Sequence, residues 1–346
     1  MRPVALRQQP RVSVVVPHYN YGQFLPTAVA SALDQTDIDL EVIIVDDRST
    51  DGSVEIARQL AASDHRVQLI EHEQNMRHIR TYNDGLSRAT GEYVVLLSAD
   101  DAVSPNSISR AVGLMEANPD VGLVYGRVEC FDGDLPRFRP TRHWWQMWDG
   151  AEWIERVARR GRNAITNPEA VMRKSVYEDI GGYNPAFPHA GDMLIWLQAA
   201  ARSDVGFVGG PRQGYYRGLH GNNMHDIDFG GVLDDISQVR DVFQQIFAEV
   251  GPNLPDADGI EPVWRSALAR EAILKGTLLV ANGEPRDTLE KFRAFAEETW
   301  PRSSDSLAWR WSALADITNA SVEHALRTTE NQRWTARYRR ANFLGL

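Results

Sequence analysis

Short apolar runs and amphipathic stretches alternate along the first third of the chain. Five runs rich in β-branched and apolar residues predict buried strands, at residues 12–16, 40–45, 67–70, 93–97 and 121–125. Four stretches between them predict helices, at about residues 23–33, 51–62, 77–89 and 105–117. This alternation predicts an α/β fold with a mostly parallel sheet and helices on both faces.

The pattern changes after residue 125. Residues 126–230 are irregular, and short strands are expected near 164–172 and 205–208. Beyond them, one apolar stripe at helical spacing consists of Val232, Ile236, Val239, Phe243, Ile246 and Val250. A loop is expected at 252–262, and further helices at about 263–282, 286–299 and most of 305–340. We therefore expect a first domain at residues 1–230 and a helical domain or extension at 231–346.

Composition narrows the classes of function. The 346 residues carry a formal charge of -10, whereas a nucleic-acid binder normally has a basic face. The single cysteine, Cys130, excludes an internal disulfide and a multi-cysteine metal site. No apolar run approaches the ~18 residues of a spanning helix, and residues 1–11 lack the apolar region of a signal peptide. These features predict a cytoplasmic protein.

The end of the chain is locally basic. Residues 333–346 contain four arginines and no acid, interleaved with aromatic and apolar side chains. Such a helix end can contact an anionic membrane surface. It can equally be a solvated helix terminus, where arginine is favoured by the helix dipole. Both interpretations stay open at this stage.

Pairs of carboxylates follow two of the predicted strands. Asp100 and Asp101 come after the run at 93–97, and Asp46 and Asp47 follow the run at 40–45. Open α/β sheets bind ligands at the carboxyl ends of their strands. Adjacent carboxylates there need positive charge, and a divalent cation holding a diphosphate would supply it. The alternative for either pair is a solvated turn or the N-cap of the next helix.

Three motifs in order carry a family resemblance. They are Val-Ser-Val-Val-Val-Pro-His-Tyr-Asn from residue 12, Val-Asp-Asp-Arg-Ser-Thr-Asp-Gly-Ser from residue 45, and Gly-Glu-Tyr-Val-Val-Leu-Leu-Ser-Ala-Asp-Asp from residue 91. Together they resemble the family 2 glycosyltransferases of GT-A fold, over roughly residues 12–225. No dinucleotide-binding glycine motif, P-loop or nucleophile elbow is present to favour another class. The resemblance implies a nucleotide-sugar half at 12–125 and an acceptor half at 126–230.

The resemblance also implies a donor site. The tyrosine ring of Tyr19 can face a base, and Asp47 can accept an N–H from a pyrimidine edge. The implied donor residues are Pro17, Tyr19, Asn20, Asp46, Asp47, Arg80 and Asp100, and the implied metal ligands are Asp101, Asp100 and His220. The cation would be Mg²⁺ or Mn²⁺, since both suit carboxylate and phosphate oxygens. Ser98 stands where many relatives carry an aspartate, which leaves one carboxylate fewer.

The acceptor side contains the expected base. Asp192 lies in Gly191-Asp192-Met193-Leu194, a segment that resembles the family's acidic motif, and the resemblance makes it the general base. Its alternative is a plain helix N-cap. Further candidates for the acceptor side or for phosphate neutralisation are Trp144, Trp145, Trp196 and Arg217. Buried packing is the usual fate of tryptophan, and it remains the alternative for these rings.

The sequence thus predicts a metal-dependent, inverting glycosyltransferase. It would move a sugar from a nucleoside-diphosphate sugar to a hydroxyl of a saccharide, lipid-linked or natural-product acceptor. A UDP-sugar is the favoured donor. Two alternatives remain. One is a nucleotidyltransferase that makes a sugar nucleotide, and the other is a non-catalytic nucleotide-sugar-binding module.

Overall fold

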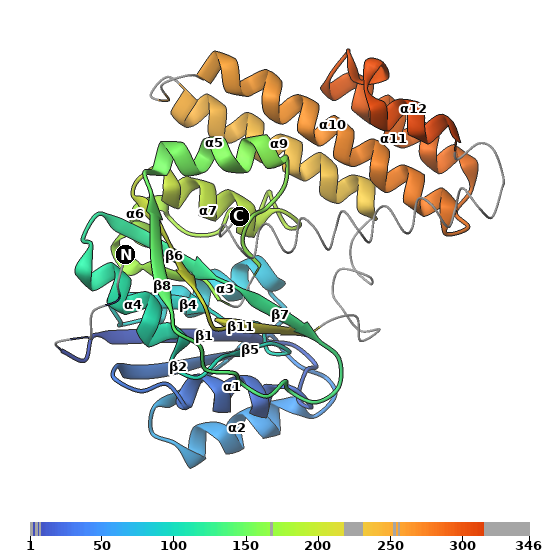
Figure 1. The fold of residues 1–346 in the computed structure, drawn as a ribbon. Coiled ribbons are helices and arrows are strands. Elements are labelled where there is room, and N and C mark those ends of the chain that lie inside the picture. The colour runs from blue at the N-terminus through green and yellow to red at the C-terminus, as the bar shows by residue number, and fades with distance from the viewer. Residues whose placement is uncertain are drawn as a thin grey trace. The chain divides into compact units, whose positions relative to one another are not determined.

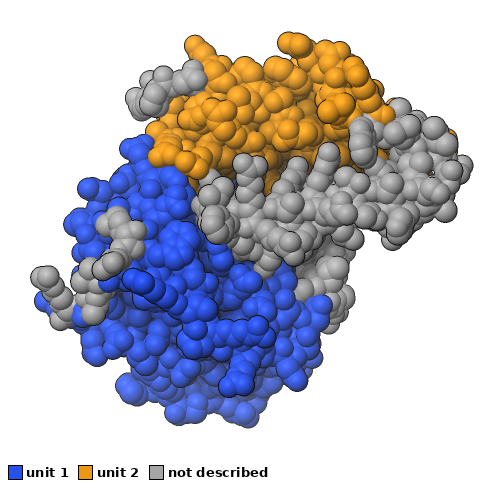
Figure 2. Space-filling model, viewed as in Figure 1, with its two compact units in different colours: residues 1–150, 165–223, 345 blue, residues 151–164, 224–344, 346 orange. Residues whose placement is uncertain are grey.

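The chain forms two compact units in a computed structural model. The structure describes residues 3, 6, 8–166, 169–217, 231–251, 254 and 257–314. One unit comprises residues 1–150 and 165–223, and the other comprises 151–164 and 224–344 (Figure 2). The expected domain boundary at residue 230 falls outside the described residues and stays a prediction.

The first unit is built on a mixed sheet. Its strands are β1 (Arg11–His18), β2 (Asp39–Asp46), β3 (Val67–Glu71), β4 (Tyr93–Leu96), β6 (Val121–Gly126), β8 (Trp144–Trp148), β9 (Val171–Arg173) and β10 (Asp204–Gly209). In the described residues these eight strands have the order β3-β2-β1-β4-β9-β6-β10-β8. Strands β3, β2, β1 and β4 run parallel, as do β6 and β10. The expected α/β class with a largely parallel sheet is confirmed.

Two strands depart from the parallel pattern. Strand β9 lies antiparallel between β4 and β6, and β8 closes the edge antiparallel to β10. Because β9 is reversed, its first residues lie at the edge where β4 and β6 end. The irregular stretch at 126–230 therefore supplies strands to the same sheet as the regular first third.

A small second sheet lies beside the first. Its three strands have the order β5-β11-β7, with β5 (Ala102–Val103), β7 (Val128–Phe131) and β11 (Gly214–Arg217) (Figure 1). Strand β11 runs parallel to β7 and antiparallel to β5. Since β5 directly follows Asp101, this pairing fixes where the acidic pair lies.

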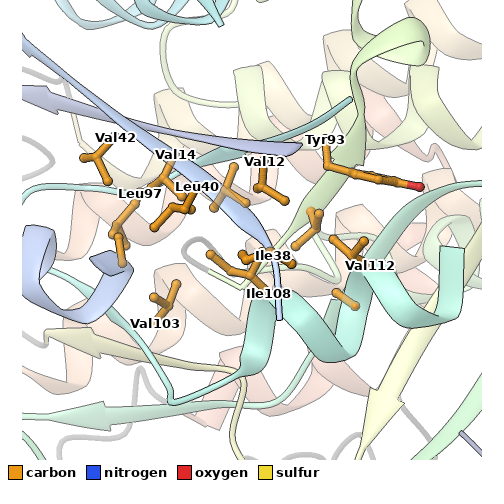
Figure 3. Packing of buried hydrophobic residues seen from close by; sticks show 14 of the residues in the cluster. Val12, Val14, Ile38, Leu40, Val42, Tyr93, Leu97, Val103, Ile108 and Val112 are labelled. Carbon is orange, nitrogen blue, oxygen red and sulfur yellow. The ribbon is translucent and has the colours of Figure 1, made fainter. Parts of the chain in front are cut away.

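Helices cover both faces of the main sheet. They are α1 (Leu25–Leu33), α2 (Ser53–Ser63), α3 (His78–Arg88), α4 (Ser107–Ala117), α6 (Lys174–Ile180) and α7 (Gly191–Ala200). Alternate side chains of a strand point to opposite faces. Val12, Val14 and Val16 of β1 accordingly join a core with helices α1 and α4, which Figure 3 shows from close by.

The opposite face packs against α3. A Cβ on Gly85 of this helix would lie 2.4 Å from Cγ1 of Val15 on β1 and 2.8 Å from Cγ2 of Val45 on β2. Only glycine permits so close an approach of helix to sheet. The even-numbered positions of β1 thus face α1, whereas Val15 faces α3, and the four helices expected between the first strands are confirmed.

The second unit is helical. Its helices are α5 (Gly150–Arg160), α9 (Val232–Val250), α10 (Ala257–Ala281), α11 (Arg286–Thr299) and α12 (Leu307–Leu314), with a 3₁₀ turn at Ser303–Asp305. Phe243 of α9 stacks on Trp264 of α10, with ring centroids 5.2 Å apart. The expected loop at 252–262 is too long, because α10 already begins at Ala257. No helix in the described part of the chain is both long and apolar enough to cross a bilayer.

Candidate active site

The expected donor residues follow strands that end at one edge of the sheet. Pro17 and His18 of β1 pair with Val45 and Asp46 of β2, and Val15 pairs with Leu96 of β4. Since these strands are parallel, the loops after β1, β2 and β4 leave the sheet on the same side. The sheet therefore brings both acidic pairs to one edge.

Asn20 connects the loops after β1 and β2 by hydrogen bonds. Its side-chain oxygen accepts the backbone N–H of Thr50 at 2.8 Å, and its own backbone N–H donates to the Ser49 hydroxyl at 3.0 Å. Asn20 has a φ of 57°, a left-handed conformation that asparagine tolerates better than most residues. Tyr19 beside it is 43% exposed. Asn20 therefore stabilises the two loops, and the exposed ring of Tyr19 is accessible to a ligand.

Asp46 organises the turn that follows β2. Its Oδ2 accepts the backbone N–H of Ser49 at 3.1 Å, while Oδ1 lies 3.7 Å from Nε2 of His18. Burial lowers the pKa of His18, although the charges of Asp46 and Asp51 oppose that shift. The alternative that Asp46 and Asp47 cap the next helix is wrong, because Asp51 bonds the first backbone N–H of α2, that of Ser53, at 2.9 Å.

Asp47 is buried and held from two sides. Its Oδ1 accepts the backbone N–H of Met76 at 2.6 Å and lies 2.9 Å from Nδ1 of His72. Its own backbone N–H donates to the carbonyl of His18 at 2.8 Å. This carboxylate is therefore oriented by the fold before any ligand arrives.

Arg80 lies within the helix expected at residues 77–89. The structure places it in the first turn of α3, and it is exposed. Residue 77, with a φ of 64°, ends the preceding loop, and α3 begins directly after it.

Asp101 is tied to β11 through Arg217. The backbone N–H of Arg217 donates to Oδ1 of Asp101 at 2.9 Å, and its Nε donates to the carbonyl of Asp100 at 3.2 Å. The guanidinium lies over the rings of Phe24 and Phe131, 4.5 Å from each centroid. The alternative that the acidic pair caps a helix is wrong, since α4 begins at Ser107 behind Asn106.

Charge at the acidic pair is only partly balanced. Burial and the neighbouring Asp100 raise the pKa of Asp101 well above its usual range, against the opposing effect of Arg217. A hard divalent cation suits two adjacent carboxylates in such a place. Among the described residues, no group of three or more His, Cys, Asp or Glu side chains could hold a metal by itself. A cation here would use Asp100 and Asp101 and complete its shell with water or ligand oxygens.

Asp192 lies in the first turn of α7. The N-cap of this helix is Ala190, so Asp192 is not a plain cap. Burial, and then the charge of Asp192, raise the pKa of the Tyr183 hydroxyl well above its usual range. Tyr183 packs edge to face on Tyr82 of α3, with centroids 5.5 Å apart.

Tyr82 connects Asp192 with the acidic pair. Burial raises the pKa of the Tyr82 hydroxyl, and the charges of Asp192, Asp100 and Asp101 raise it further. One side chain therefore senses the carboxylates of both the donor and the acceptor side. Asn83, next along α3, fixes Tyr183 by bonding both its backbone N–H and its carbonyl at 2.8 Å.

Glu169 is a buried acid at the same edge that the sequence did not single out. It precedes the reversed strand β9, is 6% exposed, and accepts the backbone N–H of Thr166 at 3.2 Å. Burial raises its pKa well above the usual range, and Asp192 adds to the shift. Its charge in turn contributes to the raised pKa of Asp101. The available signal was an acid next to a buried apolar run, which Glu169 precedes and Asp100 follows.

For Tyr82 and Asn83 the signal was different. They continue a helical stripe with Ile79 and Leu86, in which a tyrosine and an amide interrupt an otherwise apolar face. A polar side chain on the buried face of a helix needs a partner. For Asn83 that partner is the backbone of Tyr183.

The tryptophan candidates divide between packing and partial exposure. Trp145 and Trp196 are 3% and 4% exposed, and Trp145 belongs to the core of the main sheet. Trp144 is half-buried and pairs with Gly209 at the sheet's edge. Packing therefore accounts for Trp145 and Trp196. His220 and the basic segment at 333–346 lie outside the described residues.

We expect Glu169→Gln to stabilise the protein above acidic pH. Because the folded pKa of Glu169 lies above its ordinary value of 4.5, the folded state binds the extra proton and loses stability as pH rises between the two values. The loss is about 1.4 kcal/mol per pH unit in that interval. Urea unfolding in EDTA from about pH 4 to about pH 8 should show a flatter slope for the variant.

Glu178→Gln on α6 is the matched control, since the Glu178 side chain is 60% exposed. It should leave the pH slope unchanged. An equal slope in Glu169→Gln and the wild type would contradict the raised pKa of Glu169.

Comparison with known proteins indicates the family of the first part of the chain. The model of glycosyl transferase family 2 matches residues 13–181, which include both acidic pairs and Glu169. Residues 13–181 belong to glycosyl transferase family 2. GlyG, a glycosyltransferase of Streptococcus pneumoniae serotype 4, is 36% identical over 121 residues, which are 35% of this chain and 40% of GlyG. An uncharacterized glycosyltransferase of Nostoc sp. is 35% identical over 126 residues, 36% of this chain and 38% of that relative. The matches thus span less than half of either relative.

Two solved structures share the fold over most of the chain. TarS 1–349 from S. aureus, solved with UDP-GlcNAc, aligns with a TM-score of 0.65 at 16% identity and covers 93% of this chain and 92% of its own. The mannosyltransferase PcManGT from Pyrobaculum calidifontis, solved with GDP-Man and Mn²⁺, aligns with a TM-score of 0.51 at 18% identity over 99% of this chain and 87% of its own. At these identities the likeness establishes the GT-A fold.

Proposed function

We propose that this chain is an inverting glycosyltransferase that moves a sugar from a nucleoside-diphosphate sugar to an acceptor hydroxyl. The observation that carries the proposal is that the charges of Asp192, Asp100 and Asp101 all act on the buried Tyr82 hydroxyl and raise its pKa. A transferase of this type needs a base for the acceptor and a site for the leaving diphosphate within one pocket.

On the donor side, the residues after β1, β2 and β4 would bind the nucleotide or support the residues that do. Asp47, oriented by Met76 and His72, accepts an N–H of the nucleobase, and the exposed ring of Tyr19 covers the base face. Asp46 and Asn20 hold the loops that carry these two residues. Asp100 faces the ribose or the cation.

The diphosphate would lie beside Asp101 and the clamped Arg217. Mg²⁺ or Mn²⁺, held by Asp100 and Asp101, would act as a Lewis acid for the leaving group. Arg217 keeps Asp101 in place through its backbone N–H and adds positive charge next to the phosphate.

On the acceptor side, Asp192 takes the proton from the attacking hydroxyl. Its charge acts on the buried hydroxyl of Tyr183, and Asn83 fixes the backbone of Tyr183. A single displacement with such a base inverts the anomeric centre. The acceptor would be a saccharide, a lipid-linked sugar or a natural product, and the one cysteine, Cys130, is compatible with a cytoplasmic site of action.

The whole reaction would be carried by residues 1–230, with the donor half at 12–125 and the acceptor half at 126–230. Residues 231–346 would form a helical extension. Whether the basic segment at 333–346 contacts anionic lipid is a separate question for vesicle binding.

A donor screen tests the proposal. Thermal unfolding with UDP-GlcNAc, GDP-Man and a dTDP-sugar, each with and without Mn²⁺, should show a metal-dependent stabilisation by one of them. TarS was solved with the first of these and PcManGT with the second, which makes them the first donors to try. The stabilising donor should then release its nucleoside diphosphate. Binding without release would favour a non-catalytic module, and pyrophosphate formation from a nucleoside triphosphate and a sugar phosphate would favour a nucleotidyltransferase.

A further inference from the structure

His72 bridges two carboxylates behind the donor site. It directly follows β3, and its Nδ1 lies 2.9 Å from Oδ1 of Asp47 while its Nε2 lies 3.1 Å from Oδ2 of Asp84 on α3. The imidazole is 11% exposed and the Asp47 carboxylate 5%. A carboxylate at neutral pH only accepts hydrogen bonds, so both ring nitrogens must carry a proton to satisfy both contacts. The geometry thus requires an imidazolium.

The charges around His72 favour that form. Burial lowers the pKa of His72, but the hydrogen bonds from Asp47 and Asp84, and then their charges, outweigh it and raise the pKa above 6.5. On α3, Arg88 approaches the other oxygen of Asp84 at 3.4 Å and competes with the bridge.

The remaining charged groups nearby are engaged elsewhere or exposed. Glu71 of β3 is paired with Arg58 of α2 at 2.6 Å, and His18 of β1 faces Asp46. Glu73 and Arg77, in the loop after β3, are exposed. Asp47 and Asp84 are therefore the groups that set the protonation of His72.

We propose that His72 is a positioning residue whose imidazolium bridge to α3 fixes Asp47 for the donor nucleobase, so that donor affinity depends on pH. A neutral imidazole can donate to only one of the two carboxylates, and the other would face a ring lone pair. Loss of the proton therefore breaks the bridge between the donor loop and α3 and leaves the Asp47 charge uncompensated. The inference rests on the proposed function, because it assigns Asp47 to the base.

The same bridge reaches toward the acceptor side. Asp84, which binds His72, directly follows Asn83, which fixes Tyr183 beside Asp192. Helix α3 thus contacts both sides of the site. Its Asp84 binds His72, which contacts Asp47, and its Asn83 binds the backbone of Tyr183. The His72 bridge is not assigned to the acceptor or to the diphosphate. Its loss should therefore weaken the affinity for donor.

The test measures nucleoside diphosphate binding by calorimetry from about pH 6 to about pH 9, with UDP, GDP and dTDP in Mn²⁺. Wild-type affinity should be highest below the His72 pKa and fall as pH rises through it. His72→Gln should bind about tenfold more weakly or worse at the low end and lose this pH dependence. With donor sugar, its KM should rise while kcat changes little.

Asp84→Asn is the second variant. It removes one of the two charges that favour the imidazolium, so the fall in affinity should move to lower pH, an effect that a merely structural contact would not produce. In ¹H NMR the His72 ring should titrate above 6.5 in the wild type and lower in this variant. His65→Gln is the matched control, because the His65 side chain is 95% exposed, and it should match the wild type throughout.

The outcomes are distinct. If the wild type binds none of the three nucleotides, the proposed function falls and this inference with it. If it binds one of them, but His72→Gln and Asp84→Asn leave both affinity and its pH profile unchanged, only the role of His72 is overturned. A His72 ring that titrates at or below 6.5 would also overturn it.

Discussion

Asp192→Asn is expected to reduce glycosyl transfer by about 10²- to 10⁴-fold, the usual contribution of a general base. Asparagine keeps the shape of the side chain and an oxygen that can accept a hydrogen bond. It cannot take up the proton of the acceptor. Release of nucleoside diphosphate in the presence of acceptor measures the loss.

Binding separates this expectation from simple misfolding. The affinity of Asp192→Asn for donor should equal that of the wild type, because the proposed base acts on the acceptor hydroxyl and takes no part in donor binding. The matched control is Asp179→Asn on α6, whose carboxylate is 70% exposed and pairs with Arg202. Exposed pairs of this kind contribute about 0–1 kcal/mol to stability, so this control should stay active. Retention of most activity by Asp192→Asn would remove Asp192 from the role of base.

Asp101→Asn is expected to lower turnover about 10³-fold or more, since Lewis-acid stabilisation of a leaving group supplies several kcal/mol. The asparagine oxygen can still accept the backbone N–H of Arg217, so β11 should stay in place. What is lost is the negative charge that would hold a divalent cation. Donor affinity should fall together with turnover.

Removal of metal provides the internal comparison. Donor affinity of the wild type should drop when EDTA replaces Mn²⁺, and Asp101→Asn in Mn²⁺ should resemble the wild type in EDTA. Asp132→Asn, which changes an exposed carboxylate just beyond β7, is the control for a general loss of negative charge. Donor binding that is equal in Mn²⁺ and EDTA for the wild type would contradict a metal at Asp101.

The acidic edge also has a cost in stability, which argues for function. Asp101 and Glu169 are both buried with raised pKa values, and each is made less acidic by a neighbouring carboxylate. Burying charge without full compensation destabilises a fold unless a ligand supplies the missing charge. Perturbed carboxylates gathered at a ligand-binding edge are typical of functional sites. This reasoning applies to the cluster as a whole, independently of the role of any one residue.

The sequence by itself determined the parallel half of the sheet and the edge at which the site lies. Strands such as Arg11–His18 and Asp39–Asp46 are recognisable because a buried strand in a parallel sheet is apolar on both faces. Carboxylates that directly follow such strands must lie at their carboxyl ends. Asp46, Asp47, Asp100 and Asp101 could therefore be placed at one edge without coordinates.

The tertiary structure alone decided which side chains meet there. The reversed strand β9 brings Glu169 to the acidic edge, and the pairing of β11 with β5 brings Arg217 to Asp101. Both depend on register between segments far apart in the chain, which no local period encodes. The contact of His72 with Asp47 and Asp84 likewise arises from three separate elements. Local pattern reflects which face of an element is buried, whereas the partners of a polar side chain are fixed only when those faces pack together.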